Sequence, residues 1–252
     1  FGGMPYIDYV LPSDEKLRLP RLTYRESADR ITADLRRAAD LLPLNWDNTT
    51  VGKNTIGKNS MRINKAMALG YLGKNLLWAA SPLMNFTDTG SRSYDANYSK
   101  RAADVFGELL QLIENGETLY SLIPFAQKSN LFYTTGQNWA MPGGSEAMFR
   151  APTTGANGSN YQISKQFMPL LISQGDATMF MPTANYVHDN YGMANGLPLP
   201  EDISKADPES GYDPNYPWKG RDPRFYSDIT FDGVIVIQGS IPDHKRCHTY
   251  WL

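Results

Sequence analysis

The sequence predicts a mainly α-helical fold, in which tetratricopeptide-like helical hairpins precede a loop-rich part with a small β-hairpin. Three segments are predicted to be helices: two carry apolar residues at alternating spacings of three and four, the period of a helix with one buried face, and one is apolar around most of its girth. They begin near residues 23, 60 and 99, at intervals of a little under forty residues that suit stacked hairpins. After residue 122 this period gives way to Pro, Gly and Asn. We therefore expect a helical part over residues 1–122 and an irregular, ligand-binding part over residues 123–252 of the same domain.

The first helix has clear start and stop signals. Thr23 followed by Glu26 forms a capping box, in which each side chain bonds the backbone N–H of the other residue. Pro43 marks the end of the helix, since proline cannot continue it. The apolar stripe between these signals consists of Ala28, Ile31, Leu35, Ala38 and Leu42.

The second and third helices differ in how much of their surface is apolar. The second is expected from Ser60 to Ser81-Pro82 and is apolar around most of its girth, with Gly70 and Gly73 permitting a neighbour to approach closely. A long loop is then expected to contain Asn85, Phe86, Tyr94 and Tyr98. The third helix is predicted from Ser99 to Asn115-Gly116. The helix spacing alone also fits other all-helical folds, because the usual repeat consensus is absent.

The second half is predicted to hold few regular elements. One strand is expected at residues 147–150, and a short helix from Thr183 to Tyr191 after Pro182. A β-hairpin is expected from Ile229–Phe231 and Val234–Ile237, with Asp232-Gly233 supplying its turn.

Composition excludes several function classes. The 24 basic and 26 acidic residues are interspersed, so there is no basic field for nucleic acid. No run of 18 apolar residues exists to span a membrane, and the opening FGGMPYIDYV lacks the features of a signal peptide. The single cysteine, Cys247, rules out an internal disulfide framework, so stability has to come from packing.

Catalytic and metal-binding patterns are sparse. No nucleophile elbow, phosphate-binding loop or His-Glu-x-x-His pattern is present, and the protein is predicted not to be an enzyme and to need no cofactor. Asp95, Glu117 and Glu146 are nominal acids, each better explained as a surface or capping charge. His244, Cys247 and His248 lie close together but lack a second ligand cluster, so no metal site is expected.

Aromatic rings in the irregular half are the candidates for ligand binding. Flat rings beside amide side chains suit sugars, because a ring covers the apolar face of a pyranose while amides bond its hydroxyl groups. Packing within the fold remains the alternative for each ring. The candidates are Tyr133, Trp139 and Tyr161, with Asn138 and Asn160 among the neighbouring amides.

The segment GYDPNYPWKGRDPRFYSDITFDG, residues 211–233, is too rich in large rings to be a flexible linker. Asp222 before Pro223 is expected to cap a short turn, and the two arginines to tie adjacent loops to backbone carbonyls. We expect this segment to brace the irregular half against the helices rather than to meet the ligand. Its structural residues are Trp218, Arg221, Asp222, Arg224 and Phe225.

Several segments in order resemble the SusD/RagB family of Bacteroidetes outer-membrane glycan-binding lipoproteins. They are FGGMPY, LPRLTYRESADRITADLRRAADLLP, RINKAMALGYLGKNLLWAASPLMN, SEAMFRAP, PTANYVHDNYGMANGLPLP and SGYDPNYPWKGRDPRFYSDITFDG, which cover most of residues 1–235. The RDPRF-Y-x-x-I-x-x-x-G pattern is the most specific of these. The tail IQGSIPDHKRCHTYWL matches no pattern of the family.

The resemblance implies a tetratricopeptide-like scaffold (a SusD-like α-α superhelix) in a surface-exposed outer-membrane lipoprotein. Such a protein captures a glycan or oligosaccharide without catalysis and delivers it to a SusC-like TonB-dependent transporter. The alternative is a peptide- or protein-binding tetratricopeptide-type module, as in family members that import peptides. Family members are usually about twice as long and begin with a lipoprotein signal and an acylated cysteine. The chain is therefore expected to be an internal fragment whose lipid anchor lies outside it.

Overall fold

A computed structural model of the 252-residue chain describes residues 3–13, 18–59, 62–131, 145–148, 181–231 and 233–234. The chain forms two compact units, residues 1–153 and 154–252. The described residues contain six α-helices and, in place of extended strands, two isolated β-bridges, Met193–Arg221 and Asp207–Tyr212. The predicted mainly helical class is confirmed.

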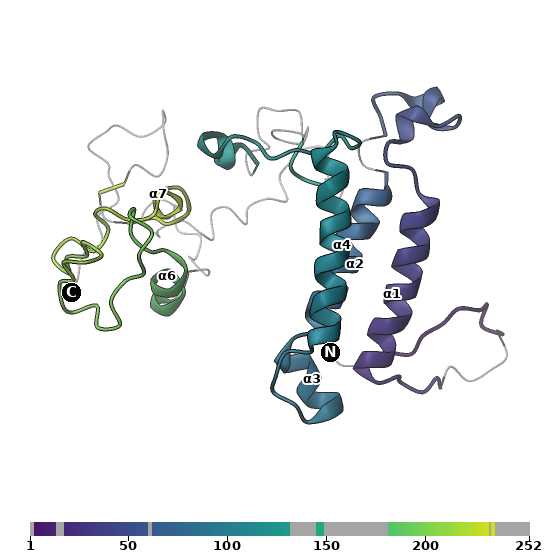
Figure 1. Ribbon diagram of the computed structural model, residues 1–252, viewed down its shortest axis with the longest axis horizontal. Coiled ribbons are helices and arrows are strands. Elements are labelled where there is room, and N and C mark those ends of the chain that lie inside the picture. Colours follow the sequence, from purple (N-terminus) through teal and green to yellow (C-terminus); the bar gives the residue numbers. More distant parts are fainter. Residues whose placement is uncertain are drawn as a thin grey trace. The chain divides into compact units, whose positions relative to one another are not determined.

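Three long helices dominate the first unit: α1 (Tyr24–Leu41), α2 (Lys65–Ala79) and α4 (Ala96–Glu114). Figure 1 shows them side by side, with the chain reversing direction from each to the next. Helix α2 packs on both α1 and α4, and its Leu69, Leu72 and Leu76 are the largest fully buried side chains of the described residues. Small residues around them, among them Ala28, Ala66 and Ala102, let the helices approach closely.

The local signals at α1 act as predicted. The Thr23 side chain accepts a hydrogen bond from the Glu26 N–H, while the Glu26 carboxylate accepts one from the Thr23 N–H. The Glu26 carboxylate accepts from both the N–H and the hydroxyl of Thr23, and these two bonds lower the pKa of Glu26 below its ordinary value. At the other end, Leu42 is extended and Pro43 follows it.

The predicted start of α2 is wrong by several residues. Asn64 is extended, with φ −131°, and its side chain accepts from the Met67 N–H, so the helix begins at Lys65 rather than Ser60. The Asn64 amide also donates to the Tyr120 hydroxyl at 2.8 Å, which fixes this cap to the chain after α4.

The predicted loop after α2 is also wrong in part. Helix α2 ends just before Ser81 and Pro82, as predicted, but these residues also begin a new helix, α3 (Pro82–Thr89), because proline is well placed in the first turn. Asn85 and Phe86 therefore lie on a helix. Helix α3 ends at Gly90, whose φ of +72° suits glycine. Asp95 then caps α4, so α4 begins at Ala96 rather than Ser99 and includes Tyr98, while Tyr94 stays in the loop.

Short 3-10 helices fill the connections of the first unit. Two lie between α1 and α2, at Trp46–Asn48 and Gly52–Thr55, and a third spans Phe125–Leu131. Buried Asn59 donates to the Gly52 carbonyl at 3.0 Å and to the Asp47 carboxylate, so its amide group organises the loop between α1 and α2.

The second unit holds two short helices, α6 (Ala184–Asn190) and α7 (Pro223–Asp228). Thr183 caps α6 and Tyr191 ends it, as predicted. The described part of the expected hairpin is not a strand, because Ile229 is the residue that ends α7. The Val234 N–H does donate to the Phe231 carbonyl at the position of the expected turn. Residues 235–237, the rest of that hairpin, lie outside the described residues, as do residues 149–150 of the expected strand.

Candidate functional site

The predicted ligand-binding residues Tyr133, Asn138, Trp139, Asn160 and Tyr161 all lie outside the described residues, so their role stays a prediction. His244, Cys247 and His248 also lie outside the described residues. In the part of the chain that the structure describes, no cluster of three or more His, Cys, Asp or Glu side chains is placed to hold a metal ion. Nor do those residues include a helix long and apolar enough to cross a bilayer.

The three nominal acids have structural contacts, as the sequence predicts. Asp95 caps α4 and pairs with Arg25 at 2.9 Å, and its hydrogen bond from the Tyr98 N–H, together with Arg25, lowers its pKa. The Glu146 carboxylate accepts from the Ile123 N–H at 2.9 Å, and Glu117 accepts from the Asn115 amide at 3.1 Å.

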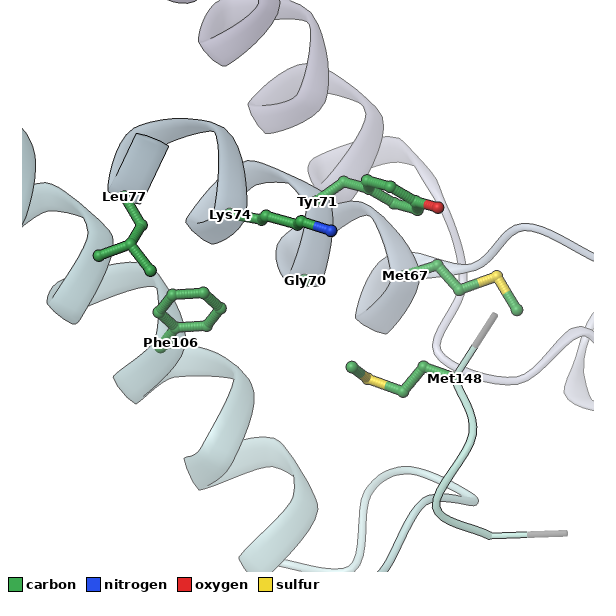
Figure 2. A pocket seen from close by; sticks show the side chains of 7 residues that line it. All are labelled: Met67, Gly70, Tyr71, Lys74, Leu77, Phe106 and Met148. Atoms are coloured by element: carbon green, nitrogen blue, oxygen red, sulfur yellow. The ribbon is translucent and has the colours of Figure 1, made fainter. Parts of the chain in front are cut away.

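An open pocket of about 380 Å³ lies on the first unit between α2, α4 and the segment at Met148. Figure 2 shows Leu77 and Phe106 at one end, Met67 and Met148 at the other, and Gly70 between them. We call this pocket the α2 groove. Its lining residues are Met67, Gly70, Tyr71, Lys74, Leu77, Phe106 and Met148.

The α2 groove follows from the apolar girth of α2. Helices α1 and α4 cover two of its sides, which bury positions such as Leu69, Leu72 and Leu76. Positions 67, 70/71, 74 and 77 recur at three- and four-residue steps and form a further stripe along the helix. On this stripe Tyr71 is 47% exposed and Leu77 is 51% exposed. Sequence reasoning missed the groove, since a helix that is apolar around most of its girth was expected to be packed on several sides without indicating which side is open.

The two glycines of α2 have different surroundings. A Cβ at Gly73 would lie 2.6 Å from Cε1 of the Phe106 ring, so α4 meets α2 there at a distance that only glycine allows. The predicted close approach is thus confirmed at Gly73. At Gly70 the nearest atom to such a Cβ is the Met148 methyl carbon at 3.3 Å, on the groove side. Gly70 therefore forms the floor of the groove.

The groove offers apolar contact and one positive charge. Its lining contains no carboxylate and no imidazole, so those seven residues supply no pair of acids. Lys74 is its single charged group, and Tyr71 adds a phenol at its edge. Such a lining is suited to binding an apolar group that carries a negative charge.

In the second unit, Arg221 ties the backbone at Tyr191 and Gly192 to the backbone at Pro217. Its guanidinium donates to the carbonyls of Tyr191 at 2.6 Å, Pro217 at 2.8 Å and Gly192 at 3.3 Å. The residue is 4% exposed, and its guanidinium carbon lies 4.6 Å from the centre of the Phe225 ring. Burial lowers its pKa from the ordinary value. The predicted tie from an arginine to backbone carbonyls is confirmed.

The other residues of this motif complete the same structure. The Asp222 carboxylate accepts from the Arg224 N–H at 2.8 Å and so caps α7, and it pairs with the Arg224 guanidinium at 2.5 Å. The Trp218 carbonyl accepts from the Tyr226 hydroxyl at 2.8 Å, and that hydroxyl accepts from the Arg221 N–H. Phe225 is buried. These contacts lie within the second unit, and bracing against the long helices stays a prediction.

Two ionisable groups lie next to this structure, His188 on α6 and Tyr191 at the end of that helix. The two ring nitrogens of His188 lie 2.7 Å from the Asp189 carboxylate and 2.9 Å from the Pro200 carbonyl, and the bonds to Pro200 and Asp189 raise the pKa of His188. Burial, with a smaller effect of the nearby Asp228, raises the pKa of Tyr191 to about 12.

The architecture is a mainly helical fold of the SusD-like type. A crystal structure of a SusD-like protein from Bacteroides fragilis matches it with a TM-score of 0.58 and 21% sequence identity, over 93% of this chain and 40% of that one. The chain therefore spans less than half the length of that neighbour. At this identity the likeness concerns the fold. No family model matches the sequence, and a search of curated proteins finds no match either.

Proposed function

We propose that the chain belongs to a SusD/RagB-type surface protein that captures a glycan without catalysis and delivers it to a TonB-dependent outer-membrane transporter. The fold match over 93% of the chain is the observation that carries this proposal. The RDPRF motif agrees with it, because Arg221, Asp222 and Phe225 have the structural contacts that were expected of this motif from the sequence.

The binding step is ring stacking combined with amide hydrogen bonds. Tyr133, Trp139 and Tyr161 supply ring faces for the C–H face of a pyranose, and Asn138 and Asn160 bond its hydroxyl groups. A lipid anchor holds the protein at the cell surface, and closure against the SusC-like transporter transfers the sugar. The proposal also predicts a gene for a TonB-dependent barrel beside the gene for this chain.

Calorimetry with a panel of neutral and acidic oligosaccharides and of unstructured peptides tests the ligand class. The proposal predicts saturable binding of at least one oligosaccharide, with no release of reducing sugar on prolonged incubation. Saturable binding confined to peptides would favour the peptide-binding alternative. Release of reducing sugar would contradict the non-catalytic function.

A further inference from the structure

The α2 groove has the geometry of a helix-packing site that the described residues leave open. Its stripe on α2 runs through positions 67, 70/71, 74 and 77, the spacing at which one helix presents a face to another. Helices α1 and α4 already occupy the other two sides. At Gly70 the α2 backbone carries no side chain, and the nearest atom to a Cβ there is the methyl carbon at the end of the flexible Met148 side chain, at 3.3 Å.

The charge in the groove selects the partner. Lys74 lies on the stripe among apolar side chains, and within the described residues no carboxylate is within 4 Å of its ammonium group. A helix whose apolar face carries one acidic side chain would satisfy both the stripe and the charge. A second copy of this chain would not, since a two-fold contact through the groove brings one Lys74 toward the other.

We propose that the α2 groove is the docking site for an amphipathic helix with an acidic residue on its apolar face, supplied by the part of a SusD-like fold outside these 252 residues. The neighbouring structure offers that source, because the match covers 40% of its length and leaves the larger part unmatched. The proposal rests on the fold of the proposed function and not on glycan binding, so the two are tested separately.

A pair of designed 18-residue helical peptides tests the docking site. Both carry the same Leu/Ala stripe, and they differ in one position of that stripe, Glu in one and Lys in the other. Fluorescence anisotropy of the labelled peptides against the full chain should show the Glu peptide binding about fivefold more tightly or better. In Lys74→Glu the preference should reverse, which a merely sticky surface would not do.

A second variant tests the groove itself. Gly70→Leu fills the floor while improving helix propensity, so the chain should keep its helical circular dichroism and bind the Glu peptide about tenfold more weakly. Lys100→Glu is the control for charge reversal, because the Lys100 side chain is exposed on α4. This variant should still prefer the Glu peptide over the Lys peptide.

Three results would overturn the proposal: no peptide binding, equal binding of the two peptides, or a preference that Lys74→Glu leaves unchanged. Sedimentation equilibrium adds a fourth, since a dimer that Gly70→Leu abolishes would identify a second copy as the occupant. If the peptides fail while an oligosaccharide still binds, the docking site is wrong and the proposed function stands. If the Glu peptide binds as predicted while no oligosaccharide binds, the docking site stands and the proposed glycan-binding function is wrong.

Discussion

The Arg221 guanidinium donates to the Tyr191 carbonyl at 2.6 Å inside the second unit, and this contact joins the end of α6 to the start of α7. Two further carbonyls, of Pro217 and Gly192, share the same guanidinium. The planar guanidinium of arginine has five N–H donors and can bond three carbonyls at once. The ammonium group of lysine, at the end of a flexible side chain, bonds fewer carbonyls in a fixed geometry. The identity of Arg221 is therefore set by geometry as well as by charge.

Arg221→Lys should destabilise the second unit by about 2 kcal/mol, because one ammonium group cannot replace all three hydrogen bonds that the buried guanidinium donates. Urea unfolding followed by near-ultraviolet circular dichroism measures this, since the rings of Tyr191, Phe225 and Tyr226 pack there. Arg224→Lys is the matched control, as its guanidinium is exposed and pairs with Asp222, and its unfolding midpoint should barely move. Equal losses in the two variants would contradict the assigned role of Arg221.

Gly73→Ala should destabilise the first unit by about 1 to 3 kcal/mol, because the new methyl group meets the Phe106 ring. Thermal unfolding followed at 222 nm checks this. The loss should disappear in a Phe106→Leu background, where the ring is gone. Gly107→Ala provides the control on α4: nothing lies within 4 Å of its Cβ position, so it should stabilise the unit by about 0.5 to 1 kcal/mol. Destabilisation by both alanines would rule out the ring contact as the cause.

The sequence predicted those features of the fold that rest on local chemistry. The Thr23–Glu26 capping box, the end of α4 at Asn115 and the Asp222 cap of α7 each depend on a few neighbouring residues, and each is found. The start of α2 was missed because Ser60 and Asn64 are equally good caps by type, and contact with Tyr120 favours Asn64.

Features that depend on tertiary packing were harder to predict. Ser81-Pro82 fits a helix stop and a helix start equally well, and the chain uses it as both. The α2 groove was not predicted, since the sequence shows that α2 is apolar around most of its girth but not which side lacks a neighbour. Conversely, the predicted ring site at Trp139 rests on composition alone and stays a prediction.

His188 should titrate above about 6.5, its ordinary pKa, because both ring nitrogens face acceptors and only the protonated ring donates to both. The nearby charges act in opposite directions: Asp189 raises the pKa and Arg221 lowers it. Proton NMR of the imidazole signals, assigned with His188→Gln, measures the value. A pKa at or below 6.5 would contradict the double hydrogen bond.

The same raised pKa sets the sign of a stability difference. A group with a higher pKa in the folded state stabilises it fully below the unfolded pKa, and this contribution is lost as the pH rises through the folded pKa. The stability difference between the native chain and His188→Gln should therefore be larger at pH 5.5 than at pH 8.5. Urea midpoints at the two pH values check this, and an opposite trend would mean that the neutral ring is the stabilising form.

The most direct test of the central proposal is a calorimetric titration of Trp139→Ala with the oligosaccharide that the native chain binds. Loss of one stacking ring should weaken binding roughly tenfold, whereas Trp78→Ala, which removes a half-exposed ring on α2, should leave the affinity unchanged. Equal affinities in the native chain and both variants would contradict ring stacking at Trp139, and no saturable binding of any oligosaccharide would contradict glycan capture itself.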